Sequence, residues 1–284
     1  ALELTAAGER MFAAARQALS AIDRSADEIR GLDGPTRVSV GTYASFASLW
    51  LVPRLAAFQQ AHPEVEVRID ATDRVVDLDA EGLDVAIRRV SAAIPIDENT
   101  VPLVVEEATP ALDRRLLERL GVRPESPADL APLPLIELET PPGKLGWTWS
   151  KWLEFAGAGQ DHRPARLRFS YFDQAVQAAI RGQGAAIVPT PFLDDLVGMG
   201  DLVAPFPSVR MPTGLRYVLV TNPRRAHLAH VQAFRAWLLD EFERGAASAW
   251  RQACVRPARG ARSGASASPA RSRPRAPRTS SRTR

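Results

Sequence analysis

The stretch RVSVGTYASFASLWLVPRLAAFQQAHPEVEVRI, from Arg37 to Ile69, decides the fold of this chain. Apolar and polar residues alternate from Arg37 to Val40, which is typical of a strand. Between Ala44 and Ala61 the apolar spacing becomes three and four, which predicts a helix, and alternation returns from Val65 to Ile69. A strand, a helix and a strand in this order predict a parallel sheet with helices on its faces. The helix would turn inward Phe46, Leu49, Trp50, Leu55 and Phe58.

The same kind of pattern continues toward the C-terminus. A short helix over 75–83 and a third strand over 85–87 would complete a first unit. From about Ala108 a second run of helix and strand patterns begins, and it includes strands at 202–206 and 215–221 before a last helix over 228–242. The sequence therefore predicts an α/β protein built of two lobes.

The segment before Arg37 has a different period. Apolar residues recur at alternating spacings of four and three, which is a heptad pattern in a helix of roughly 40 Å. Such a helix is either a linker that pairs with a second copy of the chain or an amphipathic helix that folds onto its own domain; we favour pairing. The seam positions are Met11, Ala15, Ala18, Ile22 and Ile29.

Charge is distributed unevenly along the chain. Ten of the 36 basic residues lie in Arg251–Arg284, which holds no acidic residue, so residues 1–250 carry 26 basic and 33 acidic groups, a net charge of −7. The Arg/Pro-rich end offers no large apolar side chain for a core, and we expect residues 248–284 to be disordered. The tail is a solvated appendage or a nonspecific binder of phosphates.

Several classes of protein are disfavoured by what the sequence lacks. No run of apolar residues reaches the roughly 18 needed to span a bilayer, and the first residues do not form a signal peptide, so we expect a cytoplasmic location and no membrane partner. The single cysteine, Cys254, has no second thiol and no histidine cluster nearby. No catalytic or dinucleotide-binding motif is found, and we expect neither an enzyme nor a bound metal or cofactor.

The order of the segments resembles a known family. LTAAGERMFAAARQAL at Leu4, the stretch from Arg37 and GLDVAIRR at Gly82 are similar to LysR-type transcriptional regulators after their DNA-binding domain. Further motifs agree: TPAL, PADLAPLPLI, WSKWLEFAG, FDQAVQAAIRGQGAAIVP, GDLVAPF and FRAWLLDEF. Within the family they most resemble the branch of the glycine-cleavage activator. The similarity covers about residues 2–245.

The resemblance implies an effector domain with two Rossmann-like lobes of the type 2 periplasmic-binding-protein kind, preceded by a long linker helix. Lobe I would comprise residues 35–107 plus 205–247, lobe II 108–204, and the linker 1–34. The domain would bind a small metabolite, anionic or amino-acid-like, between the lobes and form dimers or tetramers. The family's helix-turn-helix would precede residue 1, so we expect promoter DNA to be a partner only through that missing domain. The alternative is a stand-alone solute-binding protein.

Residues at the end of the first strand are candidates for the effector site. Ligands of open α/β sheets bind beyond the carboxyl ends of the strands, where helices begin. The free backbone N–H groups of the helix start and nearby hydroxyls can bind a carboxylate, although Ser45 can instead only cap the helix. The candidates here are Thr42, Tyr43, Ser45 and Ser48.

Further candidates follow other strands. Arg88 and Arg89 end the third strand, and either one can supply charge for an anion; Arg88 is the residue that we select. By family resemblance the second lobe would contribute Tyr171, Phe172, Asp173 and Thr190, although Asp173 can also be a helix cap. The three tryptophans Trp147, Trp149 and Trp152 line a pocket or pack in the core, and the spacing of the last two favours packing.

Overall fold

The structure is a computed structural model. It describes residues 36–255 except 75, 140–146 and 160–166, and from the first 35 residues only 5, 7, 8, 10–12, 14, 15, 18, 19 and 22; for residues 246–255 it describes the backbone alone. The strands are β1 (Thr36–Thr42), β2 (Val65–Ala71), β3 (Val85–Ser91), β4 (Thr100–Ala111), β5 (Leu135–Leu138), β6 (Leu167–Phe169), β7 (Ala185–Pro189) and β8 (Met211–Thr221). The helices are α2 (Ala44–Phe46), the π-helix η1 (Ala47–Leu51), α3 (Val52–Ala61), α4 (Arg114–Leu120), the 3₁₀-helix η2 (Pro127–Leu130), α5 (Trp149–Phe155), α6 (Phe172–Ile180), α7 (Leu193–Gly198) and α8 (Ala229–Val255).

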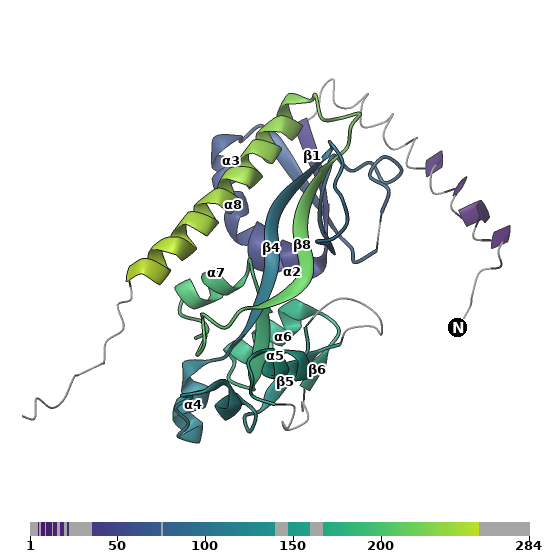
Figure 1. The fold of residues 1–284 in the computed structure, drawn as a ribbon. Coiled ribbons are helices and arrows are strands. Elements are labelled where there is room, and N and C mark those ends of the chain that lie inside the picture. Colours follow the sequence, from purple (N-terminus) through teal and green to yellow (C-terminus); the bar gives the residue numbers. More distant parts are fainter. Residues whose placement is uncertain are drawn as a thin grey trace, which may run out of the picture.

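The strands form one continuous sheet in the order β2-β1-β3-β8-β4-β7-β5-β6. At one end β1 pairs in parallel with β2 and β3, and at the other end β5 pairs in parallel with β6 and β7. The long strands β4 and β8 are antiparallel and join the two ends (Figure 1). We call β1, β2, β3, α2, η1, α3 and α8 lobe I, and α4, η2, β5, α5, β6, α6, β7 and α7 lobe II.

The deciding stretch forms the elements that its periodicity predicts. Val38 and Val40 of β1 are fully buried, and the helix that follows is continuous over α2, η1 and α3. Its middle is π-helical; Pro53 follows, and because proline has no N–H to donate, the regular hydrogen bond of the α-helix cannot form there. Of the five predicted inward residues, Phe46, Trp50 and Phe58 are buried, and the two leucines pack partly against the core.

Aromatic contacts hold the last helix against lobe I. Phe242 of α8 stacks on Trp50 with ring centroids 4.2 Å apart, and Phe234 meets Phe58 edge to face at 5.2 Å. Figure 1 shows α8 running along lobe I beside α3. Its helical backbone continues to Val255, which is past the limit that we predicted for ordered structure at residue 247. Among the described residues no helix has both the length and the apolar character to span a bilayer.

Three elements differ from the prediction. The described residues of the expected helix over 75–83 are mainly turns, because the Asp77 carboxylate accepts from the backbone N–H groups of Asp79 and Ala80 and Gly82 adopts a positive φ. The expected strand over 202–206 reduces to one bridge between Val203 and Leu112. Most of β4 was missed, because its two prolines and the exposed Val105 obscure a strand pattern.

The lobe limits at residues 107 and 205 stay predictions. The structure shows where the strands change partners: β4 pairs with β8 from Thr100 to Ala108 and with β7 from Ala108 onward. It has register shifts between Pro102 and Val104 and between Val105 and Glu107. Because bulges bend a strand, this segment of β4 is where the sheet turns from one lobe into the other.

The N-terminal helix is described at only some of its residues. The described positions from residue 7 to residue 22 have helical backbone, and Met11, Phe12, Leu19 and Ile22 are more than half exposed. Ala15 and Ala18 are exposed as well, and Ile29 lies outside the described residues. The described apolar side chains are therefore not packed into the lobes.

Candidate functional site

Two helix starts, one from each lobe, meet where the lobes are in contact. The chain enters α2 through Tyr43, whose backbone is extended, and it enters α6 through Tyr171 in the same way. Neither N-cap residue makes a side-chain cap hydrogen bond. Backbone N–H groups at both helix starts are therefore free to meet a partner from outside their own helix.

Ser45 and Asp173 are the partners that join these helix starts. The Ser45 hydroxyl donates to Asp173 Oδ1 at 3.2 Å and accepts from the Asp173 backbone N–H at 3.3 Å. Ser45 is buried, with 7% of its surface exposed. A hydroxyl of lobe I therefore caps the first turn of a helix of lobe II, and two of the predicted site residues are in direct contact.

The other candidates near the start of this helix differ in their surroundings. Thr42 is fully buried, and its hydroxyl has no hydrogen-bond partner among the described residues. Tyr43 packs on Phe46 and Tyr217 with centroids 5.9 and 6.1 Å apart, and burial raises the pKa of its hydroxyl. Ser48 is exposed one turn further along and donates to the Ser45 carbonyl. Thr42 therefore has a buried hydroxyl that could form a hydrogen bond with a ligand.

The candidates of lobe II differ in how they are engaged. Tyr171 is 45% exposed at the N-terminal end of α6, whereas Phe172 is buried against Trp147 and Phe192. Thr190 follows β7, and its hydroxyl accepts from the Glu107 backbone N–H at 3.1 Å. Its own N–H donates to the Glu107 carbonyl. Thr190 therefore links β7 to the crossing segment of β4, the part from Pro102 to Glu107 at which the sheet turns from one lobe into the other.

The two arginines that end β3 lie in different surroundings. Arg88 is half-buried, and burial lowers its pKa, while Asp70 and Glu81 of lobe I oppose that effect. Its Nη1 donates to the Ile87 carbonyl and its Nη2 has no partner among the described residues. Arg89 instead forms a bidentate ion pair with Glu106 and stacks on Trp147 of lobe II. The structure thus places Arg89, and not Arg88, against a described residue of the second lobe.

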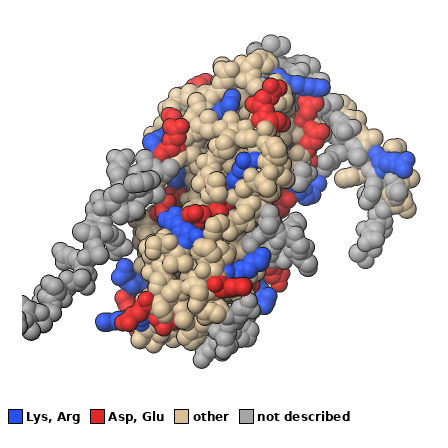
Figure 2. Space-filling view, viewed as in Figure 1, with Lys and Arg blue, Asp and Glu red and all other residues tan. Residues whose placement is uncertain are grey.

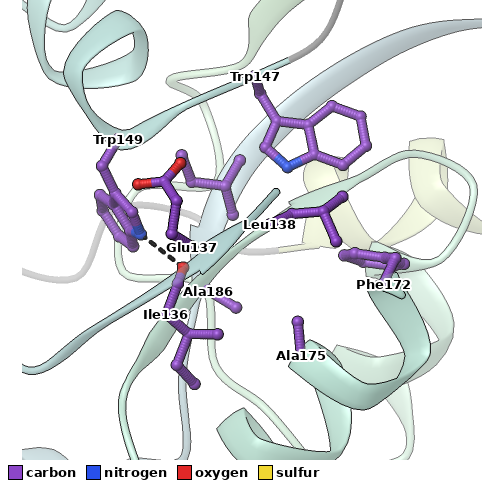
Figure 3. Close-up of a pocket in the computed structure, with 9 residues that line it drawn as sticks. Ile136, Glu137, Leu138, Trp147, Trp149, Phe172, Ala175 and Ala186 are labelled. Carbon is purple, nitrogen blue, oxygen red and sulfur yellow. Dashed lines mark hydrogen bonds between the residues drawn. The ribbon is translucent and has the colours of Figure 1, made fainter. Parts of the chain in front are cut away.

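The tryptophans of lobe II mainly build the core. Trp149 and Trp152 are buried, and the Trp149 indole donates to the Ile136 carbonyl at 2.9 Å. Trp147 faces Phe172 across the pocket of Figure 3. This pocket has a volume of about 10 Å³, which is room for about one water molecule. A metabolite can enter it only if the aromatic side chains move apart.

Sequence reasoning missed Glu106 and Tyr217 and did not select Arg89 and Trp147. Glu106 and Tyr217 lie on the central strands, and Tyr217 is paired in register with Arg89. The alternation of β8 contained the signal for Tyr217, since its buried positions include 213, 215 and 217.

The charges of the described surface are mixed in sign on the face shown in Figure 2.

Comparison with known proteins agrees with this geometry. The family model described as LysR substrate binding domain matches residues 33–243. The glycine cleavage system transcriptional activator of Escherichia coli (strain K12) is 31% identical over 84% of this chain and 75% of its own length. The HTH-type transcriptional activator AmpR of Rhodobacter capsulatus is 30% identical over 82% of this chain and 76% of its own.

The fold is also similar to solved structures. The effector domain of the transcriptional regulator AmpR of Pseudomonas aeruginosa matches with a TM-score of 0.56 and 26% identity, over 76% of this chain and 99% of that one. The predicted α/β fold of the type 2 periplasmic-binding-protein kind is confirmed, and so is the resemblance to LysR-type regulators. The chain belongs to the family of the LysR substrate-binding domain, the effector-binding part of LysR-type transcription regulators.

Proposed function

We propose that this chain is the sensing and self-associating part of a transcription regulator and that it binds a small anionic or amino-acid-like metabolite between its lobes. The observation that carries the proposal is the contact between Ser45 of lobe I and Asp173 of lobe II. A site at which two lobes meet can couple ligand binding to the angle between them, because a ligand that contacts both lobes favours one arrangement.

The chemistry of the helix starts supports an anionic ligand. The first N–H groups of a helix and its dipole favour negative charge, and the helix that begins at α2 continues for 18 residues to Ala61. The Asp173 carboxylate on the Ser45 hydroxyl is a protein-borne example of the group that we expect there. The unpartnered Thr42 hydroxyl supplies a further donor for a ligand oxygen.

The relatives support the regulatory role. Two of them are named as transcriptional activators, and the solved AmpR structure is named as an effector domain. We infer that this chain senses an effector and assembles with copies of itself, and that it catalyses no reaction. Promoter DNA would be a partner of the regulator only through a helix-turn-helix domain.

A thermal-shift screen of amino acids and small carboxylates tests the proposal. We expect at least one compound to raise the melting temperature of the chain, and the shift to shrink in Ser45→Ala and in Thr42→Ala. Ser126→Ala is the matched control, because the Ser126 hydroxyl contacts a carboxylate within lobe II alone. A shift that is unchanged in both the Ser45 and the Thr42 variants would exclude the proposed site.

A further inference from the structure

Arg89 is held in one orientation by a buried carboxylate. Its Nε and Nη2 donate to the two oxygens of Glu106 at 2.6 and 2.8 Å. Glu106 lies on the crossing segment of β4 and is fully buried. Since a buried carboxylate is costly without a partner of opposite charge, the ion pair is retained and the two parallel hydrogen bonds fix the plane of the guanidinium.

Trp147 covers one face of the same guanidinium. The Arg89 guanidinium carbon lies 4.6 Å from the centroid of the Trp147 ring, a distance at which cation–π attraction acts. Trp147 in turn meets Phe172 edge to face at 6.0 Å. Arg89 of lobe I is therefore in contact with an aromatic residue of lobe II that lines the pocket together with Phe172.

One edge of the guanidinium remains open. Nη1 has no protein partner among the described residues, and 27% of the Arg89 side chain is exposed. On β8 the residue paired with Arg89 is Tyr217, which packs on Tyr43 at the end of β1. Arg89 therefore lies at the same end of the sheet as Thr42 and Ser45. Its ion pair with Glu106 orients the guanidinium but leaves the Nη1 donor unused.

We propose that Arg89 determines the selectivity of this cleft for a carboxylate, donating from Nη1 to a ligand oxygen while Glu106 and Trp147 position the guanidinium. The proposal rests on the proposed function, since it assumes that the cleft binds a metabolite. The neighbouring Arg88 has the same charge but lies beside Gly41, where a Cβ would be 3.2 Å from its Nη2. Successive residues of a strand face opposite sides of the sheet, so Arg88 provides a matched control.

The test compares a carboxylate with its own amide. The probes are the twenty common amino acids and benzoate, each measured by calorimetry beside its primary amide. In the wild-type chain we expect the carboxylate of a binding pair to be favoured by about 10- to 100-fold, the range of a charge-assisted hydrogen bond. In the double variant R89Q/E106Q, which leaves no buried carboxylate unpaired, the preference should fall to less than about 5-fold. R88Q should keep it.

The outcomes separate the selectivity of Arg89 from the proposed function. A merely structural role of Arg89 would weaken the carboxylate and the amide equally and leave their ratio unchanged, which would overturn the proposal. Loss of the preference in R88Q would overturn it as well. If no probe binds the wild-type chain, the result contradicts the proposed function itself, on which the role of Arg89 rests. Should R89Q/E106Q not fold, R89K, which keeps the charge but lacks the fork of donors, should weaken carboxylate binding and leave amide binding unchanged.

Discussion

Gly184 lies where the backbone of lobe II is tightly packed. A Cβ at this position would lie 2.8 Å from the Pro134 carbonyl oxygen and 3.0 Å from a side-chain carbon of Ile136. We expect Gly184→Ala to lower the free energy of unfolding by about 1–3 kcal/mol, because backbone atoms must shift to make room. Urea denaturation followed by circular dichroism measures this change.

The matched control for this change is Gly198→Ala, at the end of α7. A Cβ on Gly198 would meet no atom within 4 Å, and alanine is the better helix former. This variant should be as stable as the wild type or slightly more so. Equal losses in both variants would mean that crowding at Gly184 is not the cause.

Asp113 gives the chain a specific acid dependence. Its side chain accepts from the Arg115 backbone N–H at 2.8 Å and pairs with the Arg115 guanidinium, and that guanidinium, more than the backbone bond, holds the Asp113 pKa below its usual 3.8. A lowered carboxyl pKa contributes stability above pH 3.8, and the contribution is lost as the pH falls through the lowered value. Asp113→Asn, which keeps a capping oxygen, should therefore be less stable than wild type at pH 7.

The size of this effect is limited, because Arg115 is largely exposed. We expect a small difference at pH 7 that decreases as the pH falls below 3.8, measured by urea unfolding at pH 7 and at pH 3. Glu118→Gln changes an exposed carboxylate of the same helix and should alter stability little at either pH. A difference between Asp113→Asn and wild type that is as large at pH 3 as at pH 7 would contradict the role of the charge.

At the scale of elements, an ion cluster joins three helices across the lobes. Arg54 of α3 contacts Asp195 of α7 at 2.7 Å and Glu241 of α8 at 3.6 Å, and its guanidinium lies 4.4 Å above the Trp50 ring. Each of the three charged side chains is less than a quarter exposed. Arg54→Leu would leave the Asp195 carboxylate without its cation, while Glu241 would keep its ion pair with Arg244 at 2.9 Å. We expect a loss of about 2–4 kcal/mol in unfolding free energy.

An exposed pair of the same length shows what burial adds. Arg224 and Asp79 are also 2.7 Å apart, but the side chains are 79% and 47% exposed. Arg224→Leu should cost less than about 1 kcal/mol in the same urea experiment, because solvent screens the pair. Similar losses for the two variants would show that the Arg54 cluster is no more than a surface ion pair.

At the scale of the whole molecule, the exposed N-terminal helix should determine self-association. The described apolar positions Met11 and Ile22 lie on the predicted heptad seam and are 73% and 64% exposed. We expect Ile22→Asp to reduce the mass measured by light scattering toward that of one chain, because burying a carboxylate in a helix seam is unfavourable. Deletion of residues 1–34 should have the same effect.

The control for this experiment changes a large exposed residue outside the helix. Met199 is 67% exposed near the end of α7, and Met199→Asp should leave the mass of the wild-type assembly unchanged. An unchanged mass after deletion of residues 1–34 would exclude the helix as the association surface. The two lobes would then have to supply any interface by themselves.

The local pattern of the sequence was enough to predict most elements. Alternation identified β1 and β2, and a helical period between them identified the helix from Ala44 to Ala61, because these periods follow directly from backbone geometry. Turns were harder: the Asp77 carboxylate bonds to the backbone two and three residues on, and this local competition ended a helix that apolar spacing alone had predicted.

The candidate site, too, could be predicted from the sequence only in part. Thr42 and Ser45 could be selected from the sequence because they lie where a strand ends and a helix begins, and that position is fixed by the order of elements. Asp173 was selected through the family resemblance. That Ser45 contacts Asp173, 128 residues away, and that Arg89 rather than Arg88 reaches Glu106 and Trp147, only the tertiary structure decided. The physical reason is that strand order and register, which no local period specifies, determine which side chains of distant segments meet.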